Sequence, residues 1–70
     1  MGWTVSVFSS TAAEVGYDED LGGMVVTWKN GKKSLYSGVT EEKATEVSKA
    51  PSVGSMLNSD IKPFYAHRYV

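Results

Sequence analysis

The pair Asn30-Gly31 lies between two segments with the composition of β-strands, and it constrains the fold more than any other feature of the sequence. The preceding segment, Met24–Lys29, is rich in β-branched and aromatic residues, which favour strands. Asn and Gly both tolerate the positive φ angles of a type I′ two-residue turn. We therefore predict a β-hairpin over Met24–Ser37, with Lys32–Ser37 as the returning strand.

Two more strands are expected before this hairpin. Apolar Trp3, Val5 and Val7 alternate with polar residues, a period-2 pattern that indicates a strand with one buried face. A second strand is expected over Ala12–Tyr17. Ala13, Val15 and Tyr17 are expected to share one face of this strand.

Two short helices are expected after the hairpin. Thr40 is a favourable N-cap, and the acidic pair Glu41-Glu42 suits the positive end of a helix dipole. Pro51 ends this first helix. Ser52 is expected to cap a second helix, which Pro63 ends. Its apolar face, facing the sheet, would consist of Val53, Met56, Leu57 and Ile61.

The tail Phe64–Val70 is aromatic and basic, so we expect it to pack back on the domain, with a last short strand as one way of doing so. The sequence thus predicts one α+β domain over residues 1–70. In this fold a small antiparallel sheet, formed by the hairpin Met24–Ser37, an N-terminal strand and optionally a C-terminal strand, packs against two short helices.

Composition limits the class of protein. A chain of 70 residues buries only about 60% of its unfolded surface, and without cysteine it has no disulfides. Homo-oligomerisation is the remaining common way to stabilise so small a core, so we expect a homo-oligomer. With one histidine and no cysteine, we expect no zinc or other metal site and no cofactor. No apolar run reaches the roughly 20 residues that span a membrane, so we expect a soluble cytoplasmic protein without membrane partners.

The charge distribution bears on nucleic acids. The formal net charge is −1, whereas a protein that binds a long nucleic acid usually presents a concentrated basic face, so we expect no DNA partner. The modest positive end of the chain contains Lys49, Lys62 and Arg68 against Asp60. Solvated surface charge is the alternative interpretation of these residues.

No catalytic constellation is visible. His67 is the single imidazole, and the glycine patterns of nucleotide-binding loops are absent. The carboxylates cluster in an expected turn and at a helix start, where solvation or the dipole explains them. We therefore predict a protein that is not an enzyme.

The candidate binding site centres on Ser52-Val53-Gly54-Ser55. A helix that begins here would offer unpaired N–H groups to a phosphate, and Gly54 would leave them uncovered. The alternative is an ordinary N-cap at Ser52 with close packing at Gly54. Ser55, Asn58 and Lys62 would form a polar row at α-helical spacing, where the Asn58 amide has a loop hydrogen bond as its alternative role.

Aromatic and basic residues complete the candidate site. Tyr36 and Tyr65 are candidates for stacking on a base, and Lys62 and Arg68 for neutralising phosphates. Core packing and solubility are their respective alternatives. The predicted ligand-binding residues are Tyr36, Ser52, Gly54, Ser55, Asn58, Lys62, Tyr65 and Arg68.

The order of several short motifs resembles the KTSC domain, a small domain also found at the C-terminus of some lysyl-tRNA synthetases. The resemblance extends from Ser9 to about Tyr69. The motifs are Ser9-Ser10, Val15-Gly16-Tyr17-Asp18, Trp28-Lys29-Asn30-Gly31, Leu35-Tyr36, Gly38-Val39, Ser52-Val53-Gly54, Asn58 and Ile61-Lys62. The family's usual Pro, aromatic pair and basic residue are replaced here by Thr40, Met56-Leu57 and Ser55. The synthetase fusion implies, by association, a connection with RNA or nucleotides.

Three function classes follow. The first is non-catalytic binding of a small phosphorylated ligand, a nucleotide or cyclic oligonucleotide. The protein would sequester it in a pocket shared between subunits, as a phage protein could do to blunt a nucleotide signal in the cytoplasm of a bacterial host. The second is an RNA- or tRNA-binding accessory module, and the third is a protein-interaction domain.

Overall fold

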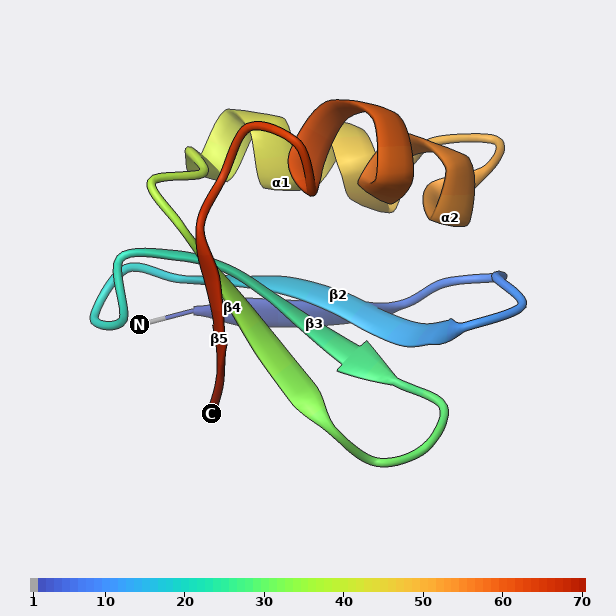
Figure 1. Cartoon of the computed structure of the whole chain (residues 1–70), viewed down its shortest axis with the longest axis horizontal. Coiled ribbons are helices and arrows are strands. Elements are labelled where there is room, and N and C mark those ends of the chain that lie inside the picture. The colour runs from blue at the N-terminus through green and yellow to red at the C-terminus, as the bar shows by residue number, and fades with distance from the viewer. Residues whose placement is uncertain (1) are drawn as a thin grey trace.

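The chain forms one antiparallel sheet whose five strands lie in the order in which they occur along the sequence (Figure 1). The structure, a computed structural model, describes residues 2–70, so Met1 of the predicted domain lies outside the described residues. The strands are β1 (Trp3–Ser6), β2 (Ala12–Asp18), β3 (Gly23–Trp28), β4 (Lys33–Ser37) and β5 (His67–Tyr69). The predicted α+β class is confirmed, and so is the C-terminal strand.

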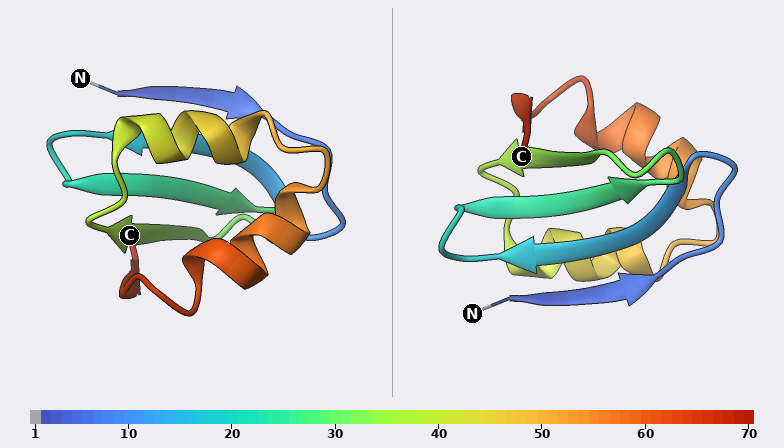
Figure 2. Two further views of the ribbon diagram at one scale, coloured as in Figure 1. Left: turned by 90° about the horizontal axis from the view of Figure 1, so that it is seen from above. Right: turned by 90° about the horizontal axis from the view of Figure 1, so that it is seen from below.

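Helices cover one face of this sheet, while the other face has no helix over it among the described residues (Figure 2). They are α1 (Glu41–Ser48), α2 (Val53–Met56) and the π-helical turn η1 (Leu57–Ile61). Helix α1 runs over β2, roughly along the strand direction, and α2 with η1 lies towards the side of the sheet that contains β4. No helix among residues 2–70 is both long and apolar enough to span a lipid bilayer.

The core lies between the helices and the sheet. Val15, Val26 and Met24 on the strands contact the apolar faces of α1 and of the α2–η1 segment. The buried members from the helices include Ala44, Val47, Val53, Leu57 and Ile61. The predicted apolar face of the second helical segment is therefore confirmed, with Met56 half-buried at its margin.

The prediction that Ala13 shares the face of Val15 in β2 is wrong. Ala12, not Ala13, is fully buried in the core. The register with β3 shifts between Ala12 and Glu14, which marks a bulge. Because a bulge inserts one unpaired residue, the alternation of faces breaks at this point.

The predicted type I′ turn is also wrong, although the hairpin itself is present. Gly31 has a φ of 90°, but no residue other than glycine has a positive φ among the described residues, so Asn30 does not adopt the type I′ conformation. The N–H of Gly31 donates to the Trp28 carbonyl over 3.0 Å, and the Asn30 side chain accepts from the Lys32 N–H. This is a three-residue loop in which one glycine after a tight turn supplies the left-handed conformation.

The first helix begins as the sequence predicts. The Thr40 hydroxyl accepts a hydrogen bond from the Lys43 N–H over 3.2 Å, and Glu41 and Glu42 occupy the first turn. The second helical segment differs. Ser52 stands at the N-cap position without a side-chain cap bond, and only four α-helical residues precede the π turn. A single α-helix to Pro63 is therefore not formed.

Candidate functional site: a lysine-rich aromatic cleft

Ser34 is the buried floor of a cleft beside strand β4. The register pairs Ser34 with Val26 of β3 on one side and with Tyr69 of β5 on the other. Ser34 is only 2% exposed, and its hydroxyl accepts a hydrogen bond from Trp28 Nε1 over 2.8 Å. A small side chain at this place leaves open the space that a larger residue would fill.

Aromatic rings form the walls. Tyr36 and His67 are paired across the strands, and their rings stack with centroids 5.5 Å apart and planes 26° apart. The Tyr69 ring meets His67 edge-on at 5.7 Å. Trp28 lies on the side of Ser34 away from β5, because β3 carries it past Val26 towards the hairpin loop. The cleft therefore has a row of rings on one side and an indole on the other.

Positive charge surrounds these rings. Lys62 Nζ lies 5.3 Å from the Trp28 ring centroid, and Lys32 Nζ lies 5.6 Å from that of Tyr69. Lys29 joins them from the hairpin loop. Each lysine over a ring makes a cation–π contact, which is worth about 0.5–1 kcal/mol at an exposed site.

The π turn brings Asn58 and Lys62 to the opposite rim. In η1 the Lys62 N–H bonds the Leu57 carbonyl over 2.8 Å, the five-residue spacing of a π-helix. Such turns are frequent at functional sites. The structure records no hydrogen bond from the Asn58 side chain to any of residues 2–70, and this side chain is exposed at the rim. Its amide is therefore available to a ligand.

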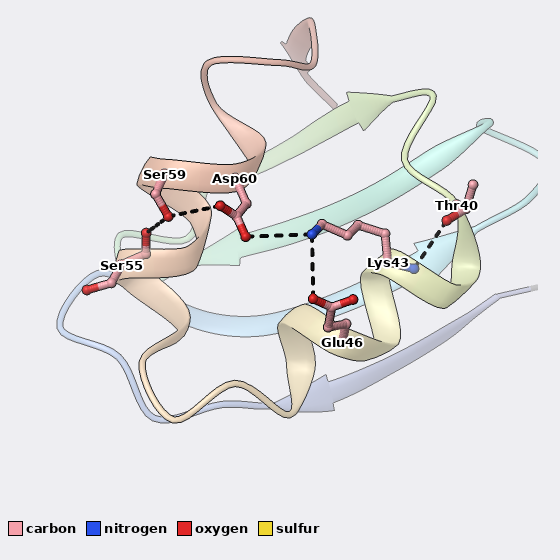
Figure 3. A network of polar contacts seen from close by, with 6 residues as sticks. All are labelled: Thr40, Lys43, Glu46, Ser55, Ser59 and Asp60. Atoms are coloured by element: carbon pink, nitrogen blue, oxygen red, sulfur yellow. Dashed lines mark hydrogen bonds and ion pairs between the residues drawn. The ribbon is translucent and has the colours of Figure 1, made fainter.

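Asp60, the acidic residue of η1, is paired outside the cleft. Lys43 Nζ of α1 lies 3.6 Å from Asp60 Oδ2 of η1 and 3.6 Å from Glu46 Oε1 of α1 (Figure 3). Lys43 therefore joins α1 to η1. The Ser59 hydroxyl donates to the Ser55 carbonyl and to Asp60. Asp60 is thus paired on the α1 side of η1, and among the described residues no carboxylate lines the cleft.

The cleft has a volume of about 750 Å³, within the range of roughly 300–1,000 Å³ typical of small-molecule sites. Most of its rim side chains are exposed, and Ser34 and Tyr36 form its buried base. The lining residues are Thr11, Trp28, Lys29, Asn30, Lys32, Ser34, Tyr36, Asn58, Lys62, His67 and Tyr69.

Tyr36 is held in its neutral form. Burial raises the pKa of its phenol above the ordinary 10.0, and the nearby Tyr69 phenolate would raise it further. At neutral pH the Tyr36 hydroxyl is therefore a hydrogen-bond donor and acceptor, not an anion that would repel a phosphate.

Three of the predicted ligand-binding residues meet in the cleft: Tyr36, Asn58 and Lys62. Ser52, Ser55 and Gly54 lie outside its lining. The Ser52 hydroxyl donates to the Ser55 hydroxyl over 3.0 Å. A Cβ added at Gly54 would lie 3.3 Å from the Ser9 hydroxyl, which supports the packing role for this glycine.

The other two predicted residues also lie outside the lining. Tyr65 is half-buried and packs against the core. Arg68 pairs with Leu35, between the cleft-lining His67 and Tyr69. Because successive strand residues point to opposite faces, the Arg68 side chain leaves on the face without helices.

Most of the cleft-lining residues are not predicted from the sequence. Trp28, Ser34 and Tyr69 line the cleft but are not among the predicted ligand-binding residues. Lys29 and Lys32 of the hairpin loop are also cleft residues that were not predicted. The alternation of His67 and Tyr69 in a terminal strand was the one available signal.

Among the described residues there is also no group of three or more His, Cys, Asp or Glu that could hold a metal.

Comparison with known proteins identifies the family. The KTSC domain matches residues 8–65 of the chain. A crystal structure of a KTSC domain protein from Yersinia pestis shares the fold with a TM-score of 0.86 at 24% sequence identity, covering 100% of this chain and 99% of that one. A comparison with curated proteins found no match. With most of its length matched by the family, this chain belongs to the KTSC domain family.

Proposed function

We propose that this protein binds a small phosphorylated ligand with an aromatic base, a nucleotide or cyclic oligonucleotide, in the cleft above Ser34. The observation that carries the proposal is the composition of the lining, which among residues 2–70 contains four aromatic rings, three lysines and no carboxylate. Rings stack on bases, with about 1–3 kcal/mol per stacked base, and lysines neutralise phosphates. A volume of about 750 Å³ suits a ligand of this size.

The role we propose is sequestration without catalysis. The imidazole in the cleft, that of His67, is packed between two phenol rings: it stacks on Tyr36 and meets Tyr69 edge-on. A protein that only holds a nucleotide would lower the concentration of a signal, as a phage protein acting in a host cytoplasm could do. The homo-oligomer expected from the chain length stays a prediction, which light scattering tests.

Isothermal titration calorimetry with mononucleotides and with cyclic di- and trinucleotides tests this function. We expect saturable binding of at least one of them, and chromatography should recover the ligand unchanged. No heat at high micromolar concentration would contradict the binding function, and hydrolysis of the ligand would contradict the non-catalytic role. Affinity that grows with RNA length would instead favour an RNA-binding module.

Adjacent lysines provide a matched pair of variants. Lys32 lines the cleft, whereas Lys33 lies on the opposite side of β4, beside Val25 and Val70. Lys32→Met should weaken nucleotide binding by about three- to tenfold, because it removes one charge-assisted contact. Lys33→Met changes the net charge equally and should leave binding unchanged. Equal losses in both would show that only the overall charge matters.

A further inference from the structure

The ring best placed to receive a base, the Trp28 indole, is covered by a lysine side chain. Trp28 is half-buried, and its indole nitrogen is fixed by the hydrogen bond to Ser34, so the ring has a defined orientation. Tyr69, by contrast, is 66% exposed on a strand of three residues. Lys62, from the far rim, lies over the Trp28 ring at 5.3 Å.

A lysine ammonium group and a nucleobase compete for the same ring face. The ammonium group is attracted by the ring quadrupole, and a base stacks on the same π surface. Lys62 is exposed and follows the last residue of η1, and its four-carbon chain lets the ammonium group move without moving the backbone. A ligand that carries a phosphate offers Lys62 a new partner when its base takes the ring.

We propose that Lys62 is an exchangeable cap on Trp28: the ligand's base displaces it from the indole, and Lys62 then contacts the ligand's phosphate. This inference rests on the proposed nucleotide binding and deepens it. A nucleoside, which has no phosphate, would have to displace the lysine without compensation. Lys62 therefore makes the site select phosphorylated ligands over their unphosphorylated counterparts.

The variant Lys62→Met separates this role from a simple structural one. Methionine keeps an unbranched apolar chain of similar length but carries no charge. Removing the cation–π cap should strengthen nucleoside binding by about two- to fivefold, since such a contact is worth about 0.5–1 kcal/mol at an exposed site. The same variant should weaken nucleotide binding by about tenfold, because it loses a charge-assisted phosphate contact.

The experiment is calorimetry of the parent and Lys62→Met proteins with the four common nucleoside 5′-monophosphates and with the matching nucleosides. Lys49→Met, an equal charge change at the exposed C-cap of α1, is the control and should alter neither class. Indole fluorescence gives a second readout, because a base on Trp28 should quench it. Trp3→Phe removes the other tryptophan from that signal.

Tighter nucleoside binding together with weaker nucleotide binding in Lys62→Met would support the exchange. Lys62→Met that weakens both classes, or leaves nucleosides unchanged, would overturn it while the nucleotide-binding function stands. Nucleotide binding without nucleoside binding in either protein would overturn it as well. Failure of every nucleotide and cyclic oligonucleotide to bind the parent protein would overturn both the inference and the proposed function.

Discussion

The indole nitrogen of Trp28 donates a hydrogen bond to the buried hydroxyl of Ser34 over 2.8 Å, joining the wall and the floor of the cleft. Strands β3 and β4 supply one partner each, so the contact depends on their register. A ring held in this way loses little conformational freedom when a ligand stacks on it, which reduces the entropic cost of binding.

Ser34→Ala should destabilise the protein by about 1–2 kcal/mol, because it leaves the half-buried Trp28 N–H without its partner. Nucleotide affinity should fall as well, since the ring is no longer fixed. Ser37→Ala, at an exposed position of the same strand, is the control and should stay within about 0.5 kcal/mol of the parent. Urea unfolding measures both, and equal effects of the two variants would contradict the role given to this hydrogen bond.

Asn58 and Arg68, two exposed residues predicted from the sequence to bind the ligand, should differ in their effect on nucleotide binding. Asn58 lines the cleft with its amide available, so Asn58→Ala should weaken nucleotide binding by about three- to tenfold with little change in melting temperature. Arg68→Ala should leave binding unchanged, because the strand alternation directs this side chain to the other face. Calorimetry and thermal melts measure the pair, and the reverse pattern would place the ligand on the face without helices.

The contrast between Asn58 and Arg68 shows what could be predicted from the sequence. Composition, alternation and capping residues were enough for the hairpin, helix α1 and the fold class. The facing of Arg68 depends on the register of a three-residue strand, which only pairing with β4 determines.

The α2–η1 segment also differs from what the sequence predicts. An α-helical spacing predicts a polar row at Ser55, Asn58 and Lys62, but the π turn from Leu57 takes more residues per turn. Asn58 and Lys62 therefore reach the cleft while Ser55 does not. No propensity in the sequence distinguishes such a turn from a continuous α-helix.

The hairpin loop that carries Lys29 and Asn30 depends on Gly31. Its φ of 90° is strained for any residue with a Cβ, although no heavy atom lies within 4 Å of where that Cβ would be. Gly31→Ala should therefore cost about 1–2 kcal/mol through backbone conformation alone. Gly31→Asn should cost less, because asparagine adopts this conformation more readily. Urea unfolding compares them, and equal losses would contradict a purely conformational cause.

The raised pKa of Tyr36 predicts how stability changes at alkaline pH. Burial is the main cause and Tyr69 the second, so the folded protein holds the phenolic proton more tightly than the unfolded chain does. This contribution to stability is fully present below the ordinary pKa of 10.0 and is lost as the pH rises from there through the raised folded value.

Tyr36→Phe removes this titration, so its free energy of unfolding should fall less steeply than that of the parent above the ordinary tyrosine pKa of 10.0. Tyr69→Phe removes the second cause and should reduce the steepness only in part. Urea unfolding at a series of alkaline pH values gives the three slopes. Parallel slopes for the parent and Tyr36→Phe would mean that the unfolded chain binds this proton as tightly as the cleft does.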